Sequence, residues 1–315
     1  MDSIGNVLKQ LGGSRIHQRT EDLKAKILNE PDVRQLRLRH PELTEQELIR
    51  NMSRLYEYMK EKRHCAECPG LDKCPNDFQG HYTKLSVDEV GGQLRIRDHK
   101  TPCNLQLAHE RDKLISSRIR SFYVDERALI EGYDEVEIML KDPARSPAVN
   151  RIFRYINETK AAGLPTKGLY LEGPFGTGKT FLMCYLLHEL AKEGHSGVIV
   201  YMPDFVEDVK SMIQDGDRLR DTVEMMKETD LLIFDDIGAE NMGPWVRDHV
   251  LGSILNHRMN RKPTFYTSNY SLSALEKHLS FTNKDGEEAY KGERLMNRVS
   301  PFVEVVRVLG ENQRG

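Results

Sequence analysis

The sequence of 315 residues predicts an α/β protein whose C-terminal half forms a five-stranded parallel sheet covered by helices. In that half, short and almost continuously apolar segments alternate with segments of helical periodicity. Strands that are buried on both faces of a sheet are apolar throughout, which favours the parallel arrangement. The expected strands are 169–171, 197–202, 231–234, 263–267 and 302–307. A small domain of helices and a β-hairpin is expected before them.

Composition restricts the class of protein. Charged residues make up 30% of the chain, yet the formal net charge is only −3, so any basic surface must be local. The N-terminus has no apolar signal core, and no segment approaches the roughly 20 apolar residues of a membrane span. We expect a cytoplasmic protein with no membrane partner, in which crowded cysteines favour metal over disulfides.

The N-terminal part has a helical pattern followed by a strand pattern. Residues from about 4 to 63 carry apolar side chains at helical spacing. Thr44 is expected to cap a helix there, with Glu47 completing a capping box. The apolar stripe of this helix either packs in a core or docks a partner's helix. Two segments that alternate in period two around Gly91-Gly92 then predict a hairpin.

Three of the five cysteines lie between that helix and the hairpin. Cys65 and Cys68 form a C-x-x-C turn, a spacing that brings two thiolates onto one Zn²⁺, and Cys74 and His81 would complete a tetrahedron. The competitors for the fourth position are Cys103, His64 and His99. The alternatives are unpaired thiols and a redox dithiol, although a redox motif normally opens a helix and here Pro and Gly follow. The pattern favours a structural zinc that stabilises a small domain.

The most specific motif lies between the first expected strand and the next helix. Gly173 to Thr180 fits G-x-x-x-x-G-K-[ST] without a mismatch. Its backbone N–H groups and the helix N-terminus would cradle a phosphate. Lys179 would reach the β- and γ-phosphates, and the Thr180 hydroxyl would sit on Mg²⁺. The predicted ATP-binding residues are Gly173, Pro174, Phe175, Gly176, Thr177, Gly178, Lys179, Thr180 and Phe181.

Polar side chains follow two later strands. Asp235 and Asp236 end the third expected strand, where a carboxylate faces the ligand crevice of a parallel sheet. Asp235 would hold Mg²⁺ and Asp236 would orient or deprotonate the attacking water. Asn269 ends the fourth strand and would contact the γ-phosphate and that water, as sensor 1. A turn residue is the alternative for Asn269.

Two arginines near the C-terminus, Arg294 and Arg298, are four residues apart and share a helix face. The functional interpretation is that Arg294 enters a neighbouring subunit's site as an arginine finger, which requires an oligomer. The alternative is a solvated helix face.

Together these motifs resemble the helicase-loader branch of the AAA+ ATPases, the DnaC/DnaI/IstB branch. The ordered set is Gly173–Thr180, Asp235–Glu240, Thr267–Asn269 and Gly292–Arg298. It covers about half of the chain. The N-terminal half, with its helices and its Cys-rich segment, is similar to the zinc-bearing helicase-binding domain of loaders from Gram-positive-type bacteria.

The resemblance implies a loader that delivers the hexameric replicative helicase onto single-stranded DNA at origins or restart sites. Residues 1–105 would be a zinc-binding helicase-interaction domain, 106–145 a linker, and 146–315 an AAA+ domain that binds ATP and single-stranded DNA and self-associates. Basic residues at 210, 218, 220 and 227 would line the path of that single strand, or are ordinary surface charge. Other primosome proteins are further candidate partners. The competing readings are an IstB-like transposition helper and a zinc-anchored adaptor that binds ATP only as a structural ligand.

Three details of the resemblance bear on turnover. Asp236 departs from the commoner Asp-Glu order, so hydrolysis is expected to be slow and switch-like. The chain ends soon after the fifth expected strand, and no C-terminal helical lid is expected. The sensor 2 arginine is left open between Arg314 and Arg307.

Overall fold

The computed structural model describes residues 22, 24–90, 93–122, 124, 143–282, 284 and 286–312. The chain divides into two compact units, Met1–Asp112 and Lys113–Gly315, and each is described by itself. The division falls within helix α5 (Asn104–Arg118). Within the described ranges, no helix is both long and apolar enough to cross a membrane.

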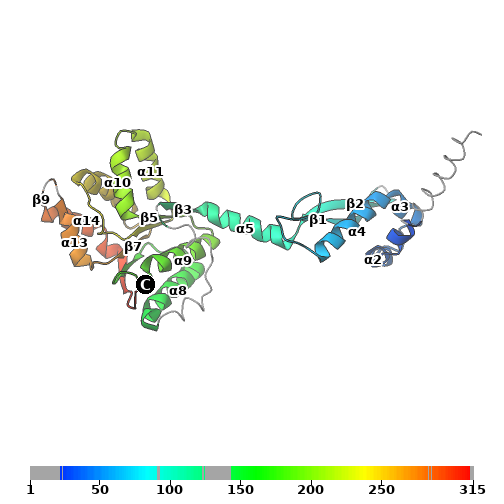
Figure 1. Cartoon of the computed structure of the whole chain (residues 1–315), viewed down its shortest axis with the longest axis horizontal. Helices are drawn as coiled ribbons and strands as arrows, with labels where there is room; N and C mark the ends of the chain where they lie inside the picture. Colours follow the sequence, from blue (N-terminus) through cyan, green and yellow to red (C-terminus); the bar gives the residue numbers. More distant parts are fainter. Residues whose placement is uncertain are drawn as a thin grey trace, which may run out of the picture. The chain divides into compact units, whose positions relative to one another are not determined.

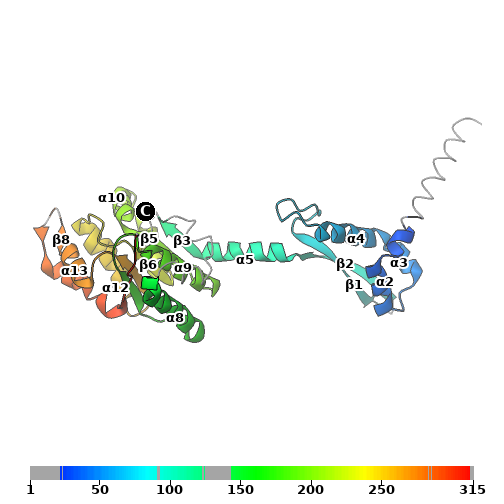
Figure 2. The same cartoon turned by 60° about the horizontal axis from the view of Figure 1, so that its bottom comes forward.

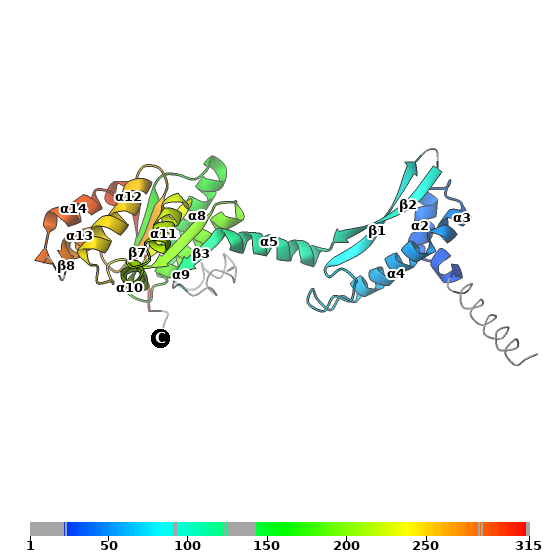
Figure 3. The same ribbon diagram turned by 90° about the horizontal axis from the view of Figure 1, so that it is seen from above.

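Unit 1 is a small assembly of helices on a two-stranded antiparallel hairpin. Its elements are α2 (Pro31–Arg39), α3 (Glu45–Arg50), α4 (Met52–Ala66), β1 (His81–Val90) and β2 (Gln93–Pro102). Helix α4 lies along the hairpin (Figure 3). Leu48, Leu55 and Ile96 are among the residues of the core between them. This core is small, as expected for a unit of this length.

Two predictions for unit 1 are confirmed. Residues 81–102 form the hairpin, with Val87 opposite Ile96, although the Gly91-Gly92 turn lies outside the described residues. The capping box is present: Thr44 Oγ1 accepts from the Glu47 N–H at 3.3 Å, and Glu47 Oε2 accepts from the Thr44 N–H at 3.1 Å. The start of the expected helical run, residues 4–21, also lies outside the described part.

Unit 2 is a parallel sheet with helices on both faces (Figure 1). The strand order is β10-β4-β7-β6-β5-β3, and every neighbouring pair is parallel. The strands are β3 (Ile119–Phe122), β4 (Gly168–Glu172), β5 (Gly197–Tyr201), β6 (Leu231–Asp235), β7 (Thr264–Ser268) and β10 (Val303–Arg307). A small separate pair is β8 (Phe281–Thr282) and β9 (Gly286–Glu287).

The helices divide between the two faces of the sheet. Helices α8 and α9 lie on one side and α10 on the other (Figures 1 and 2). The helical elements are η1 (Pro143–Arg145), α8 (Ser146–Ala162), α9 (Lys179–Lys192), α10 (Met202–Met212), α11 (Gly216–Glu228), η2 (Val246–Leu251), α12 (Gly252–Arg258), α13 (Leu272–Ser280), α14 (Ala289–Met296) and η3 (Ser300–Phe302).

Successive residues of the central strands face opposite cores. Leu169 and Leu171 pack with α8 and α9, whereas Tyr170 packs with the cluster that includes α10 and α12. Side chains alternate across a strand, so a strand between two helical layers must be apolar at every position. This explains the continuous apolar segments of the sequence.

The expectation of five strands was wrong, because the sheet has six. The five predicted strands are present within one residue of their expected ends, but β3 was assigned to the linker 106–145. It pairs with β5 at the edge of the sheet and has only four residues, of which Arg120 is exposed and the others are half-buried. A short edge strand directly after a helix lacks the apolar run that reveals a buried strand.

Candidate active site

A glycine-rich loop joins β4 to α9, which begins at Lys179. Gly176 and Gly178 have φ of 75° and 87°, a conformation that residues with a side chain rarely adopt. A Cβ on Gly178 would lie 2.9 Å from the guanidinium of Arg145. The loop can therefore fold closely around a phosphate, with backbone N–H groups and the positive end of α9 directed at it.

The Lys179 ammonium is buried beside this loop. Its Nζ donates to the carbonyl oxygens of Gly173 and Pro174, both at 2.8 Å, and to Oδ1 of Asn269 at 2.9 Å. Asn269 donates through Nδ2 to Oδ1 of Asp236 at 3.0 Å. Residues from the loop and from the ends of β6 and β7 thus form one hydrogen-bonded chain.

Asp235 ends β6 and is only 3% exposed. Thr180 Oγ1 lies 2.9 and 3.0 Å from its two carboxylate oxygens, and Thr267 Oγ1 donates to Oδ1 at 2.6 Å. Burial raises the pKa of the Asp235 carboxyl, against these two hydrogen bonds, which lower it. A hydroxyl and a carboxylate side by side are the hard oxygen ligands that Mg²⁺ takes, so Thr180 and Asp235 fit the predicted magnesium site.

These side chains line one pocket of about 220 Å³. Strands β4, β6 and β7 are parallel, so their carboxyl ends meet at one edge of the sheet. The predicted residues that line the pocket are Phe175, Gly176, Gly178, Lys179, Thr180, Phe181, Asp235, Asp236 and Asn269. Gly173 and Pro174 hold Lys179 through their carbonyls, and Thr177 is buried and donates to the Pro174 carbonyl.

The pocket also contains residues to which sequence analysis gave no role. Thr267 bonds Asp235 and accepts from the Asp236 N–H at 2.8 Å, and Tyr201 lines the wall at the end of β5. Tyr201 ends β5 and Thr267 is the last residue but one of β7, and a polar side chain at the carboxyl end of an apolar strand is a signal that could have identified them. Arg145 is 3% exposed and its Cζ lies 6.0 Å from the Phe181 ring centroid. An arginine between prolines offers no sequence signal of burial.

Arg294 lies outside this pocket. It is exposed on α14 and lines a separate pocket of about 400 Å³ together with Lys291 and Arg298. Burial, and then the charge of Arg294, lower the pKa of Arg298. The structure therefore places Arg294 on the surface of unit 2, and its role as a finger stays a prediction.

The structure does not support the predicted zinc site. Within the described residues there is no group of three or more histidine, cysteine, aspartate or glutamate side chains that could hold a metal ion. The residues concerned are Cys65, Cys68, Cys74 and His81. His81 Nδ1 lies 2.9 Å from the Gln79 carbonyl oxygen, and Cys65 Sγ accepts from Asn76 Nδ2 at 3.6 Å. Both side chains thus contact polar groups of the same loop.

The two candidates for the sensor 2 arginine are Arg314 and Arg307. Arg314 lies outside the described residues. Arg307 ends β10, is exposed, and donates through Nε to Oε1 of Glu172 at 2.9 Å. Arg307 is absent from the residues that line the nucleotide pocket.

Comparison with known proteins identifies the family. The family described as the N-terminus of primosomal protein DnaI matches residues 1–94, and the IstB-like ATP-binding family matches 165–314. The replicative helicase loader DnaI of Bacillus subtilis is 34% identical over 317 residues, spanning 100% of this chain and 99% of that protein. The chain belongs to the DnaI family of helicase loaders.

Other relatives match less of the chain. A crystal structure of DnaI is 31% identical and superposes with a TM-score of 0.51, covering 65% of this chain and 100% of that one. An ATP-binding protein of insertion sequence IS1162 from Pseudomonas fluorescens is 32% identical over 100 residues, which is 32% of this chain and 42% of that protein. The DnaI family and the phosphate loop with its two aspartates make the chain an ATPase of the AAA+ class.

Proposed function

We propose that this protein loads the replicative DNA helicase onto single-stranded DNA in an ATP-dependent manner, during initiation or restart of replication in the cytoplasm. One observation carries the proposal: similarity to a replicative helicase loader extends over the whole chain and includes both units. The nucleotide pocket of unit 2 supplies the ATP dependence.

The residues of the pocket divide the work of hydrolysis. Lys179 would exchange its loop carbonyls for the β- and γ-phosphates. Thr180 and Asp235 would hold Mg²⁺, which neutralises charge on the phosphates during transfer. Asp236 would accept the proton of the attacking water, and Asn269, bonded to both Lys179 and Asp236, would hold that water in line.

Loading of the cognate replicative helicase onto single-stranded DNA tests this function directly. The wild-type chain with ATP should place the helicase on a circular single strand, measured by recovery of the DNA–helicase complex on a sizing column. Lys179→Ala should abolish ATP binding and loading because the β/γ contact is lost. Loading by Lys179→Ala that equals the wild type would refute an ATP-dependent loader.

The division of labour between the units is part of the proposal. Residues 1–105 would contact the helicase, 106–145 would act as linker, and 146–315 would bind ATP and single-stranded DNA. The match of residues 1–94 to the DnaI N-terminus supports the first assignment. In unit 2, Lys210, Arg220 and Lys227 each pair with a carboxylate three residues away, so they offer little free charge to DNA.

Self-association of unit 2 would bring Arg294 to a neighbouring nucleotide. Support comes from its exposure on α14 and from the basic pocket that it shares with Lys291 and Arg298. A guanidinium supplied by a second subunit would stabilise charge that develops on the γ-phosphate. The rate of ATP hydrolysis would then depend on self-association of the chain.

Zinc binding by unit 1 is a separate proposal that rests on the C-x-x-C spacing of Cys65 and Cys68. The purified chain should carry close to one zinc per molecule, measured by elemental analysis. Cys65→Ser with Cys68→Ser should lose that zinc. A chain that folds and binds helicase without zinc would remove the proposal.

The IstB-like helper is the alternative function. The IstB-like family matches residues 165–314 only, so it accounts for unit 2 but not for unit 1. A helper of that kind should bind duplex DNA and ignore the replicative helicase. Binding of the chain to the replicative helicase and to duplex DNA, measured in parallel, distinguishes the two functions. A loader should bind the helicase, and an IstB-like helper should bind the duplex.

A further inference from the structure

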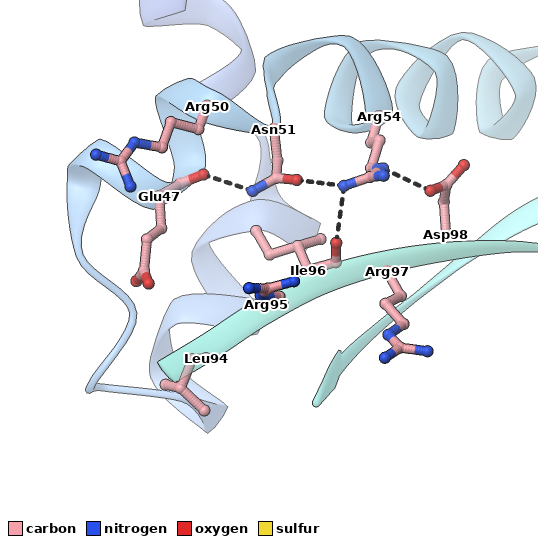
Figure 4. A pocket seen from close by; sticks show the side chains of 9 residues that line it. All are labelled: Glu47, Arg50, Asn51, Arg54, Leu94, Arg95, Ile96, Arg97 and Asp98. Carbon is pink, nitrogen blue, oxygen red and sulfur yellow. Dashed lines mark hydrogen bonds and ion pairs between the residues drawn. The ribbon is translucent and has the colours of Figure 1, made fainter. Parts of the chain in front are cut away.

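A pocket of about 530 Å³ lies in unit 1, where the junction of α3 and α4 faces β2. Arginines supply four of the nine residues that line it, and none of the nine is aromatic. The lining residues are Glu47, Arg50, Asn51, Arg54, Leu94, Arg95, Ile96, Arg97 and Asp98 (Figure 4). Its volume falls in the range of pockets that bind ligands.

One arginine forms a rigid base for this pocket. Arg54 Nη1 donates to Asn51 Oδ1 at 2.6 Å and to the Ile96 carbonyl at 3.1 Å, and its Nε lies 2.6 Å from Asp98 Oδ1. Asn51 Nδ2 in turn donates to the Glu47 carbonyl at 2.8 Å (Figure 4). These bonds join α3, α4 and β2, so the pocket is preorganised.

The carboxylates of the lining are already engaged. Glu47 accepts from the Thr44 backbone and hydroxyl, and Asp98 pairs with Arg54. Arg97 pairs with Asp88, which lies outside the pocket, at 3.1 Å. Arg50 and Arg95 are exposed, and within the described residues neither forms an ion pair. Among the described residues, the lining therefore has two guanidinium groups without an ion pair, against one carboxylate, that of Glu47, whose partner Thr44 carries no charge. The lining is thus net positive in a chain whose net charge is −3.

We propose that this arginine pocket receives an acidic segment of the replicative helicase. The inference rests on the proposed function and adds the chemistry of the contact. Guanidinium groups pair with carboxylates through two parallel hydrogen bonds, which gives both affinity and orientation. The same two helices expose Ile49 by 41% and Tyr56 by 47%, a mixture of arginine and apolar surface typical of protein interfaces.

Single-stranded DNA is the competing occupant, and the lining argues against it. Sites for single strands combine basic residues with aromatic side chains on which bases stack, and this pocket has no aromatic residue. Five of the nine lining residues, up to Leu94, lie in the part of the chain that matches the DnaI N-terminus, and all nine lie outside the region that matches the IstB-like ATP-binding family.

The test compares full-length variants for binding to the cognate helicase, by interferometry at low and high salt. Arg50→Glu with Arg95→Glu should weaken binding by roughly 10-fold or more, because two attractive contacts become repulsive. The matched control is Lys84→Glu, an exposed charge reversal on β1 outside the pocket, which should bind as the wild type does. ATP affinity should not change in either variant. Circular dichroism verifies that both are folded.

The possible outcomes distinguish a failure of the pocket proposal from a failure of the proposed loader function. Wild-type chain that binds helicase, with a double variant that binds equally well, overturns the pocket and leaves the loader intact. A double variant that loses only single-stranded DNA binding, measured with a labelled oligonucleotide, overturns it in favour of nucleic acid. Wild-type chain that shows no affinity for helicase sinks the proposed function and this inference together.

Discussion

Asp236 has a backbone conformation that few residues with side chains adopt, with φ of 55°. Its N–H donates to Thr267 and its carboxylate accepts from Asn269, so both ends are held. Asp and Asn are the side chains that tolerate this region best. Asp236 lines the pocket in this conformation. A Glu in place of Asp236 would have to adopt the same positive φ.

Asp236→Asn keeps this conformation but removes the proton acceptor. Steady-state hydrolysis should fall by roughly 100-fold or more, whereas ATP affinity should stay within a factor of about two. Turnover and fluorescent-nucleotide binding measure the two quantities. Unchanged turnover would show that Asp236 is not the base.

His278 is a residue through which the stability of unit 2 should depend on pH. The neighbouring carboxylate of Glu240 raises the pKa of the His278 imidazole, whose Nε2 lies 3.5 Å from Glu240 Oε1. A raised folded-state pKa means that the charged pair stabilises the fold below the ordinary value of about 6.5, and that this contribution is lost as pH rises through the folded value.

His278→Gln should therefore destabilise unit 2 more at about pH 6 than at about pH 8. Urea unfolding of both proteins at each pH gives the difference. A destabilisation that is independent of pH would contradict a charged His278–Glu240 pair.

At the scale of elements, helices α13 and α14 approach closely at a glycine. A Cβ on Gly292 would lie 2.6 Å from the Glu276 carbonyl oxygen and 2.0 Å from Ser280 Oγ. The carbonyl belongs to the backbone of α13 and cannot rotate away. Gly292 therefore sets the distance between the helix that carries Arg294 and the rest of unit 2.

Gly292→Ala should cost about 1–3 kcal/mol of unfolding free energy, because the helices must move apart. Gly216→Ala is the matched control, since a Cβ there meets nothing within 4 Å. Chemical denaturation measures both. Equal stability of the two variants would show that α14 adjusts without strain.

Elements with a strong local signal were predictable, and one without such a signal was not. The buried strands, the hairpin and the Thr44 cap all follow from local side-chain patterns. Strand β3 is formed by pairing with β5, since its four residues lie at an edge and are mostly half-buried. Edge strands take their structure from the neighbouring strand rather than from their own sequence.

At the scale of the whole molecule, hydrolysis should depend on assembly. Arg294→Ala should bind ATP as the wild type does but lose the rise in turnover with protein concentration, an effect of roughly 1,000-fold for an arginine finger. The control is Glu293→Ala, an exposed neighbour on α14. The measurement is ATP turnover per molecule over a series of protein concentrations. If turnover of Arg294→Ala still rises with concentration, Arg294 is not an arginine finger.

The sequence by itself determined the phosphate loop, the two aspartates at the end of β6 and Asn269, because these motifs are contiguous and follow recognisable strands. It also determined the α/β class, since strands buried on both faces must be apolar throughout. Only the tertiary structure decided that Arg145 is buried against the loop, that Arg294 lies away from the nucleotide pocket, and that Arg50 and Arg95 share a pocket. These depend on contacts between segments far apart in the chain, which no local pattern encodes.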